Sequence, residues 1–381
     1  SFLISSLLLL PLFEVLDYEQ PSAYIVKSTE YNDTYKTPVL TAGQSFILGY
    51  TNEVDGIFKA SKDNPVIIFD DFTTGFHWVD FDFKVKSSAM KMLRPKGNHA
   101  LFRYVYYAME CIHYIPSEHT RHWISQYSLF EIPLPPLPVQ QEIVRILDTF
   151  TELQDNLKQE LDLRKKQLEY YRDSFFCSSV EEMYIRGKQE GFKVVPISSL
   201  GSLTRGKRFV KADSVEEGAP CIHYGEIYTY YGVSASEAKS HISYEQTKRL
   251  RHAVKNDVII VGAGENNVDI GIGVAWLGEE EVAVHDACYT LHHNENPLYI
   301  SHYLRSQVYH QQIKRDVSEG KICSISAQGV GRALIPLPSL SKQSEIVENL
   351  NAFEGLIENI KTELAARQKQ YEYYREQLLT F

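Results

Sequence analysis

The residues of this sequence best suited to binding chemistry are lysines and arginines gathered in one short segment. Arg205, Lys207, Arg208 and Lys211 stand close together around a glycine, after an apolar stretch. Arginine can bond to guanine through two hydrogen bonds, and lysine mostly neutralises phosphate. The segment therefore predicts contact with nucleic acid, the alternative being a charged loop that faces solvent.

Aromatic side chains and a second basic cluster follow this segment. Tyr224 and Tyr228 could stack or pack near a ligand, although core or surface packing explains them equally well. Lys248, Arg249 and Arg251 form the second cluster, which we expect on a helix. It would bind phosphates or simply face solvent.

Short polar loops follow apolar stretches in both halves of the chain. Thr73, Thr74 and His77 follow the first stretch, and Asn266 and Asn267 follow the second. Threonine and asparagine side chains suit hydrogen bonds to base edges and phosphates. The alternative is ordinary turn chemistry.

More positive charge comes later in the first half. Lys84 and Lys86 are candidates for contact with nucleic acid, and so is Arg121, which stands two residues before Trp123. Packing of Trp123 into a core is an equal alternative for that last stretch. Neither half holds enough positive charge for us to expect tight binding to DNA by this chain alone.

One set of residues could instead support catalysis. Asp71, Asp82 and Lys84 resemble the spaced acid, acid-x-Lys set with which nucleases hold a divalent metal, and the second half has no counterpart. His285 and Cys288 fit no familiar zinc spacing, so we expect no metal site. Gly262 and Gly264 lack the third glycine of a dinucleotide-binding loop.

A long internal repeat organises the elements that position these residues. Ile132–Phe176 aligns without a gap to Ile335–Leu379 at an offset of 203 residues, with 23 of 45 positions identical. Each copy begins with Ile-Pro-Leu-Pro, which is extended because proline rings exclude helix. A long helix is then expected from about Val139 and from about Lys342.

Apolar residues recur every three and four positions along each copy, which is the pattern of a heptad seam. About 38 residues at ~1.5 Å each would span roughly 57 Å. Such a seam needs a partner, so we expect the two copies to pack as an antiparallel pair. Polar breaks at Gln154, Arg164 and Arg367 would help to fix the register. The alternative is that each helix covers a separate body. The residues selected for pairing are Leu147, Phe150, Leu157, Leu161, Leu350, Phe353, Ile360 and Leu364.

Mixed α/β sequence fills the rest of the chain. Strands are expected at Pro65–Phe69 and Asp257–Val261, and aromatic helices at Leu101–Met109 and Leu298–Ser306. The fold class is therefore mixed α/β (α+β), with two globular domains separated by two long antiparallel coiled-coil helices and pseudo-two-fold symmetry. We expect four segments: a domain at 1–131, a Pro-rich lead-in and spacer helix at 132–176, a domain at 177–334, and a second lead-in and helix at 335–381.

Composition limits the class of protein. The net charge is −10, so positive charge must be local if the protein binds nucleic acid. Five scattered cysteines without a C-x-x-C motif favour a reduced, cytoplasmic protein. No stretch approaches the ~20 continuous apolar residues of a membrane helix, so no membrane partner is expected.

The duplicated Ile-Pro-Leu-Pro-x-Leu-x-x-Gln-x-Glu-Ile-Val segments, each followed by a helix ending in Glu-Tyr-Tyr-Arg, are similar to those of a known family. The sequence resembles the specificity (S) subunits of type I restriction-modification systems over essentially its whole length. Thr37–Gly43 and Ile222–Thr229 also look like segments of that family.

The resemblance implies a non-catalytic protein that recognises double-stranded DNA. Two target-recognition domains would each read half of a bipartite site, and the helices would set the gap between the halves. Two methyltransferase (M) subunits and restriction (R) subunits would bind to it. S-adenosylmethionine, Mg2+ and ATP would be used by those other subunits, with no cofactor bound here. A coiled-coil scaffold without DNA binding is the remaining alternative.

Overall fold

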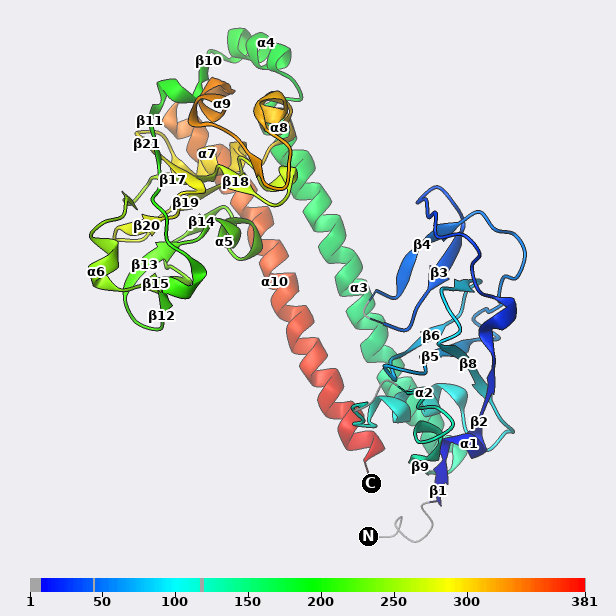
Figure 1. Cartoon of the computed structure of the whole chain (residues 1–381). Coiled ribbons are helices and arrows are strands. Elements are labelled where there is room, and N and C mark those ends of the chain that lie inside the picture. The colour runs from blue at the N-terminus through cyan, green and yellow to red at the C-terminus, as the bar shows by residue number, and fades with distance from the viewer. Residues whose placement is uncertain (1–7, 44, 117–119, 381) are drawn as a thin grey trace. The chain divides into compact units, whose positions relative to one another are not determined.

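The computed structural model describes residues 8–43, 45–116 and 120–380. The chain divides into two compact units, and both are drawn in Figure 1. The first unit comprises Ser1–Lys158 and Glu363–Phe381, and the second comprises Gln159–Thr362. Each long helix is therefore shared between the units, whereas the four predicted segments kept the helices separate from the globular regions.

The first unit is built on two small sheets. A four-stranded antiparallel sheet contains, in spatial order, β2 (Leu16–Glu19), β8 (Met90–Pro95), β5 (Val66–Asp70) and β6 (Phe76–Val79). A three-stranded sheet contains β4 (Ile47–Thr51), β3 (Thr37–Leu40) and β7 (Lys84–Val85). The shorter elements are β1 (Leu8–Pro11), α1 (Leu12–Val15), η1 (Pro21–Ala23), α2 (Phe102–Glu110), η2 (Tyr127–Leu129) and β9 (Glu131–Leu134).

The second unit contains two larger sheets. One contains, in order, β11 (Gly201–Arg205), β21 (Cys288–His293), β17 (Val258–Val261), β19 (Gly273–Trp276) and β14 (Ser234–Ala235). The other contains β12 (Ser214–Val215), β15 (Ser240–Ile242), β13 (Ala219–Ile222), β20 (Val282–Val284) and β16 (His252–Ala253). Two further strand pairs are β10 (Lys193–Pro196) with β23 (Leu334–Leu337), and β18 (Ala263–Gly264) with β22 (Cys323–Ser324).

Short helices connect the strands of the second unit. The α-helices are α4 (Val180–Glu190), α5 (Tyr224–Thr229), α6 (Tyr244–Thr247), α7 (Pro297–Tyr303), α8 (Gln307–Ile313) and α9 (Ala327–Arg332). The 3-10 helices are η3 (Ile197–Ser199), η4 (Lys211–Asp213), η5 (Asn267–Asp269) and η6 (Lys314–Asp316).

The two units repeat one strand arrangement. In the first, β5 lies between β8 and β6, and β3 pairs parallel with β7; in the second, β17 lies between β21 and β19, and β13 pairs parallel with β20. The strand that carries each Ile-Pro-Leu-Pro segment, β9 or β23, pairs antiparallel with β1 or β10. The internal duplication therefore extends beyond the helices into both globular regions.

The apolar strands were placed correctly from the sequence. Every residue of β5 and of β17 is buried, because both faces of these central strands are covered. The predicted aromatic helices are also present, as α2 and α7. The largest core cluster of the second unit includes β17, α7 and the adjoining half of each long helix.

The long helices are α3 (Leu137–Phe176) and α10 (Leu340–Leu379), each of 40 residues and therefore about 60 Å long. Both begin two residues before the predicted starts at Val139 and Lys342. Pro138 is accommodated because the first turn of a helix has no partner for its amide groups in any case.

Within each unit the two long helices pack against each other. In the first unit Phe150 stacks on Tyr374 with ring centroids 5.4 Å apart, and the Gln154 side-chain amide donates to the Arg367 carbonyl at 3.4 Å. Numbers rise on one helix as they fall on the other, so the pair is antiparallel. In the second unit Tyr171 stacks on Phe353 at 4.8 Å. The mixed α/β class with two long paired helices is confirmed.

No helix among the described residues is long and apolar enough to cross a membrane.

Candidate nucleic-acid interface

The basic segment predicted from the sequence begins at the end of β11. Gly206 follows, and its amide donates to the Cys288 carbonyl at 3.0 Å, while the Lys207 amide donates to the Val284 carbonyl at 3.0 Å. A Cβ at Gly206 would come within 2.3 Å of the carbonyl oxygens of Val284 and His285. Only glycine lets the chain pass here, so the backbone holds the basic side chains beside the 284–288 turn.

The cationic side chains around this turn are held by main-chain carbonyls. Arg205 Nε donates to the Asp286 carbonyl at 2.7 Å, and Lys207 Nζ donates to the Arg249 carbonyl at 2.8 Å. Arg251 Nη1 donates in turn to the Arg205 carbonyl at 2.6 Å. These bonds orient the charged groups but leave their charge uncompensated. The second basic cluster lies just after α6, which ends at Thr247, and was therefore wrongly expected on a helix.

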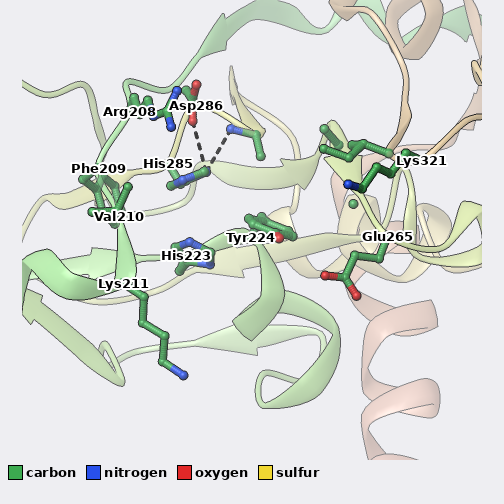
Figure 2. A pocket seen from close by; sticks show the side chains of 14 residues that line it. Arg208, Phe209, Val210, Lys211, His223, Tyr224, Glu265, His285, Asp286 and Lys321 are labelled. Carbon is green, nitrogen blue, oxygen red and sulfur yellow. Dashed lines mark hydrogen bonds and ion pairs between the residues drawn. The ribbon is translucent and has the colours of Figure 1, made fainter.

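A cavity of about 710 Å3 opens beside this segment (Figure 2). Arg208, Lys211 and Lys321 stand around it, and aromatic rings line it. The His285 ring centroid lies 4.4 Å from that of His223 and 5.4 Å from that of Tyr224. The cavity thus combines an aromatic lining with charged groups, which suits contact with bases and phosphates.

The two histidines of this lining are held neutral. Burial lowers the pKa of His223, and burial together with neighbouring His223 lowers the pKa of His285. His285 Nδ1 accepts a hydrogen bond from the Ala287 amide at 3.0 Å, which requires its lone pair. The contact of Nδ1 with Asp286 at 3.3 Å is therefore not an ion pair near neutral pH. Positive charge belongs to the arginines and lysines.

The tyrosines predicted for this region lie on α5. Tyr224 and Tyr228 are half-buried, with ring centroids 6.4 Å apart, and both pack against the core. Tyr224 lines the cavity, whereas Tyr228 does not. Core packing therefore applies to both tyrosines. Tyr224 also presents surface to the cavity, and its contact with a ligand stays a prediction.

Asn266 and Asn267 lie at the start of η5, on the turn after β18, and are exposed. The Asn266 side chain donates to Asp269 at 3.4 Å, and that of Asn267 donates to Glu319 at 3.2 Å. The Asn266 bond is local turn chemistry, whereas the Asn267 bond joins the turn to a distant segment. These bonds occupy part of the hydrogen-bonding capacity of both side chains, and their exposure leaves them available to a ligand.

The corresponding turn of the first unit joins β5 to β6. Asp70 accepts hydrogen bonds from the amides of Phe72 and Thr73, and Thr74 has a positive φ of 58°. Thr73 is exposed, but Thr74 is buried, so Thr74 is not available for base contact as predicted. His77 lies in β6, where its Nε2 lies 3.2 Å from the Gly43 carbonyl.

Lys84 corrects the sequence prediction most clearly. Its side chain is only 2% exposed, and its Nζ pairs with Glu53 at 3.0 Å and donates to the Asp55 carbonyl at 2.7 Å. The ammonium group holds the segment 53–55 against β7 and cannot reach a phosphate. Lys86, two residues later, is exposed and remains a candidate.

Arg121 stands at the surface beside the first turn. Its Nη1 lies 3.7 Å from Asp71, and its guanidinium group lies 5.9 Å from the Phe72 ring centroid. Trp123 is buried, which confirms the packing alternative for that residue. Arg121 therefore combines exposure with a fixed orientation.

The nuclease alternative is wrong. Asp71 is buried and pairs with Lys91 at 3.0 Å, Asp82 pairs with Lys59 at 2.5 Å, and Lys84 pairs with Glu53. The three residues thus belong to separate ion pairs. Across the described ranges no group of three or more histidine, cysteine, aspartate or glutamate side chains could hold a metal ion.

The residues selected for helix pairing divide into two sets. Leu147 and Leu350 are fully buried, and the other six are partly buried: Phe150, Leu157, Leu161, Phe353, Ile360 and Leu364. Leu147 and Phe150 pack in the core of the first unit, and Leu161, Leu350 and Phe353 pack in the core of the second. Near the globular regions, the apolar seam of each long helix therefore packs against the globular core as well as against the partner helix.

A duplicated pair of buried glutamines was missed by the sequence analysis. Gln140 Oε1 accepts from the Leu101 amide at 2.8 Å, and its Nε2 donates to the Pro135 carbonyl at 2.8 Å. Gln343 makes the same bonds to Asn296 (3.0 Å) and Pro338 (2.9 Å). Both glutamines occupy the same position of the repeat, and this could have indicated their shared role from the sequence. Each glutamine ties the start of a long helix to its globular body.

Comparison with known proteins supports one family. The model for the type I restriction modification DNA specificity domain matches residues 11–163 and 189–366. The chain is 39% identical to the specificity subunit of the type I restriction enzyme EcoR124I/EcoR124II of Escherichia coli, over 98% of this chain and 94% of that one. The crystal structure of the S subunit of the type I restriction-modification system from M. genitalium has a similar fold, with a TM-score of 0.56 and 15% identity over 100% of this chain and 98% of the other. The chain therefore belongs to the family of type I restriction-modification DNA specificity subunits.

Proposed function

We propose that this chain reads a bipartite site on double-stranded DNA, with one target-recognition domain, at 1–131 or 177–334, on each half of the site. As a specificity subunit it is the non-catalytic, DNA-recognising member of a type I restriction-modification enzyme. The repeated strand arrangement is the observation that carries the proposal. Two bodies of one design but different surface residues suit a site whose two halves differ in sequence.

Two methyltransferase subunits and restriction subunits would bind this chain and supply the chemistry. S-adenosylmethionine, Mg2+ and ATP would then act on those subunits, which fits a chain in which the candidate catalytic acids are engaged in ion pairs. A subunit that works on cellular DNA together with these partners would act in the cytoplasm.

The long helices would set the gap between the two half-sites. The glutamine ties at Gln140 and Gln343 join each helix start to its body, so the length of the helices is transmitted to the bodies. DNA rises about 3.4 Å per base pair, and seven helical residues span about 10.5 Å. One heptad therefore corresponds to about three base pairs.

Mapping of methylated adenines tests this proposal in cells that express the chain with its methyltransferase subunit. Wild type should yield a split motif with a fixed gap. A variant with one heptad inserted after Lys158 and another after Thr362 keeps the seam in phase and should lengthen the gap by about three base pairs, with both half-sites unchanged.

An insertion of the same length into the exposed turn after β4, at Asn52, serves as the control and should leave the gap unchanged. A split motif whose gap does not respond to the helix insertions would refute the spacer role. Absence of any sequence motif in wild-type cells would refute DNA recognition itself.

A further inference from the structure

Six exposed cationic side chains of the second unit form what we call the basic patch. They come from the segment that follows β11 and from the segment that follows α6, and the hydrogen bond from Lys207 to the Arg249 carbonyl joins the two. The members of the patch are Arg205, Lys207, Arg208, Lys211, Arg249 and Arg251.

The basic patch has no carboxylate partner. Among the described residues, none of the six has a carboxylate oxygen within 4.0 Å. Some cations of the same unit are paired, as Lys248 is with Glu245 at 2.8 Å. Others, such as Lys188 and Lys193, have no ion pair among the described residues, but they do not lie in the two joined segments. What distinguishes the patch is that six unpaired cations gather on two joined segments of a chain whose net charge is −10.

Acidic residues do stand nearby, but other groups engage them. Asp213 accepts a hydrogen bond from the Val210 amide at 2.7 Å, and Glu226 accepts one from the His223 amide at 2.9 Å. Glu245 pairs with Lys248 at 2.8 Å. The patch keeps its positive charge although carboxylates were available to neutralise it.

Main-chain carbonyls hold three members of the patch in place, through Arg205, Lys207 and Arg251. Such bonds fix the position of a cation without cancelling its charge. Like charges held together repel one another in the free protein, and that repulsion is relieved when an anion with several charges binds. A run of phosphates is such an anion.

The first unit has no counterpart of this patch among its described residues. Its cations on the sheet and on α2 are paired, as with Lys91 and Asp71 at 3.0 Å and Arg103 and Asp148 at 2.8 Å. Lys36, Lys62 and Lys86 are exposed and without ion pairs, but they lie on separate segments of the chain.

We infer that the basic patch provides most of the contacts of this chain with the DNA phosphates, so that the two reading bodies contribute unequally to binding. The second unit supplies most of the electrostatic attraction to the DNA phosphates. The first unit contacts its half-site with few unpaired cations. This inference rests on the proposed function and assigns the phosphate contacts within it.

Salt dependence of binding measures phosphate contacts directly. Each contact contributes about −0.9 to the slope of log affinity against log salt concentration. Arg208, Lys211 and Arg249 suit substitution because their side chains make no hydrogen bond within the described part of the chain. The patch variant carries Arg208→Gln, Lys211→Gln and Arg249→Gln.

The assay measures the binding of the assembled complex with its methyltransferase subunits to a fluorescent duplex that contains the mapped split motif, between 50 and 200 mM KCl. Loss of three contacts should reduce the steepness of the slope by about 2.7. Wild type should then lose about fortyfold more affinity across this salt range than the patch variant loses.

A control variant with the same change in charge carries Lys27→Gln, Lys36→Gln and Lys62→Gln in the first unit, where Lys27 is likewise exposed and has no ion pair among the described residues. Its slope should stay within about one unit of the wild-type slope. The inference is overturned if the patch variant keeps the wild-type slope, or if the control flattens the slope as strongly as the patch variant does.

Assembly with the methyltransferase subunits is checked by size-exclusion chromatography. A patch variant that no longer assembles would show that the patch binds a partner subunit, and this also overturns the inference. The proposed function fails separately, if the wild-type complex methylates no split motif. A split motif together with an unchanged slope in the patch variant refutes only the assignment of phosphate contacts.

Discussion

Because His302 is buried, we predict that the second unit loses stability in mild acid. His302 lies on α7 with no exposed surface, and its Nε2 lies 3.1 Å from Asn351 Oδ1 on α10. Its Nδ1 is buried and has no hydrogen-bond partner among the described residues. Burial, with help from nearby Arg172 and Arg305, lowers the pKa of His302 to about 3, against the smaller opposing effect of the Asn351 bond.

The sign of the effect follows from proton uptake. An exposed histidine in the unfolded chain has a pKa of about 6.5 and takes up a proton as the pH falls below that value. The folded protein does not, because the pKa of His302 is lowered. Stability from this residue is therefore fully present above pH ~7 and is lost as the pH falls toward 3.

The magnitude follows from the same difference. Between pH 7 and pH 5 the unfolded state gains about 0.7 proton at this site, and the free energy of unfolding falls by about 2 kcal/mol. Burial also lowers the pKa of His223, His285, His293 and His310, so the total loss in wild type exceeds that of His302 alone.

Urea unfolding followed by circular dichroism at pH 7 and pH 5 isolates the contribution of His302. His302→Gln can still bond to Asn351 but cannot take up a proton, so its loss of stability between the two pH values should be smaller than that of wild type by about 2 kcal/mol. His113→Gln, at an exposed position, is the matched control. An equal loss in wild type and His302→Gln would refute the reasoning.

Two further predictions concern the buried polar groups. Gln343→Ala removes partners from the Asn296 amide and the Pro338 carbonyl and should destabilise the protein by about 1–3 kcal/mol. Gln140→Ala should cost a similar amount because its bonds are the same, and a loss in only one variant, measured by urea unfolding, would contradict the equivalence of the two ties. Lys84→Met leaves Glu53 without its cation and should cost about 3 kcal/mol, while the salt dependence of DNA binding stays unchanged. A flatter salt slope for Lys84→Met would restore Lys84 as a DNA contact.

The candidate interface was predictable only in part. The basic segment at 205–211 was visible as a cluster in the sequence, since its members are neighbours along the chain. The lining of the cavity was not, because His223 and His285 follow different strands and meet only when β13 and β20 pair. Lys321 reaches the same cavity from yet another segment.

The repeat and the spacing of apolar residues were enough to place α3 and α10 and the central strands β5 and β17. These features depend on local periodicity and on burial of a continuous apolar face, which neighbouring residues determine together. The duplication also indicated that the two globular regions share one design, which the strand order then confirmed.

Only the tertiary structure decided which charges are free. Lys84 and Arg208 are both cations that the sequence offered as DNA contacts. Lys84, however, is buried against Glu53 and against the carbonyl of Asp55, which stands 29 residues before it in the sequence. Arg208 meets no carboxylate within the described residues and stays exposed. The charge available to a ligand depends on which groups folding brings within a few ångströms, and Coulomb interactions between distant segments leave no periodic trace in the sequence.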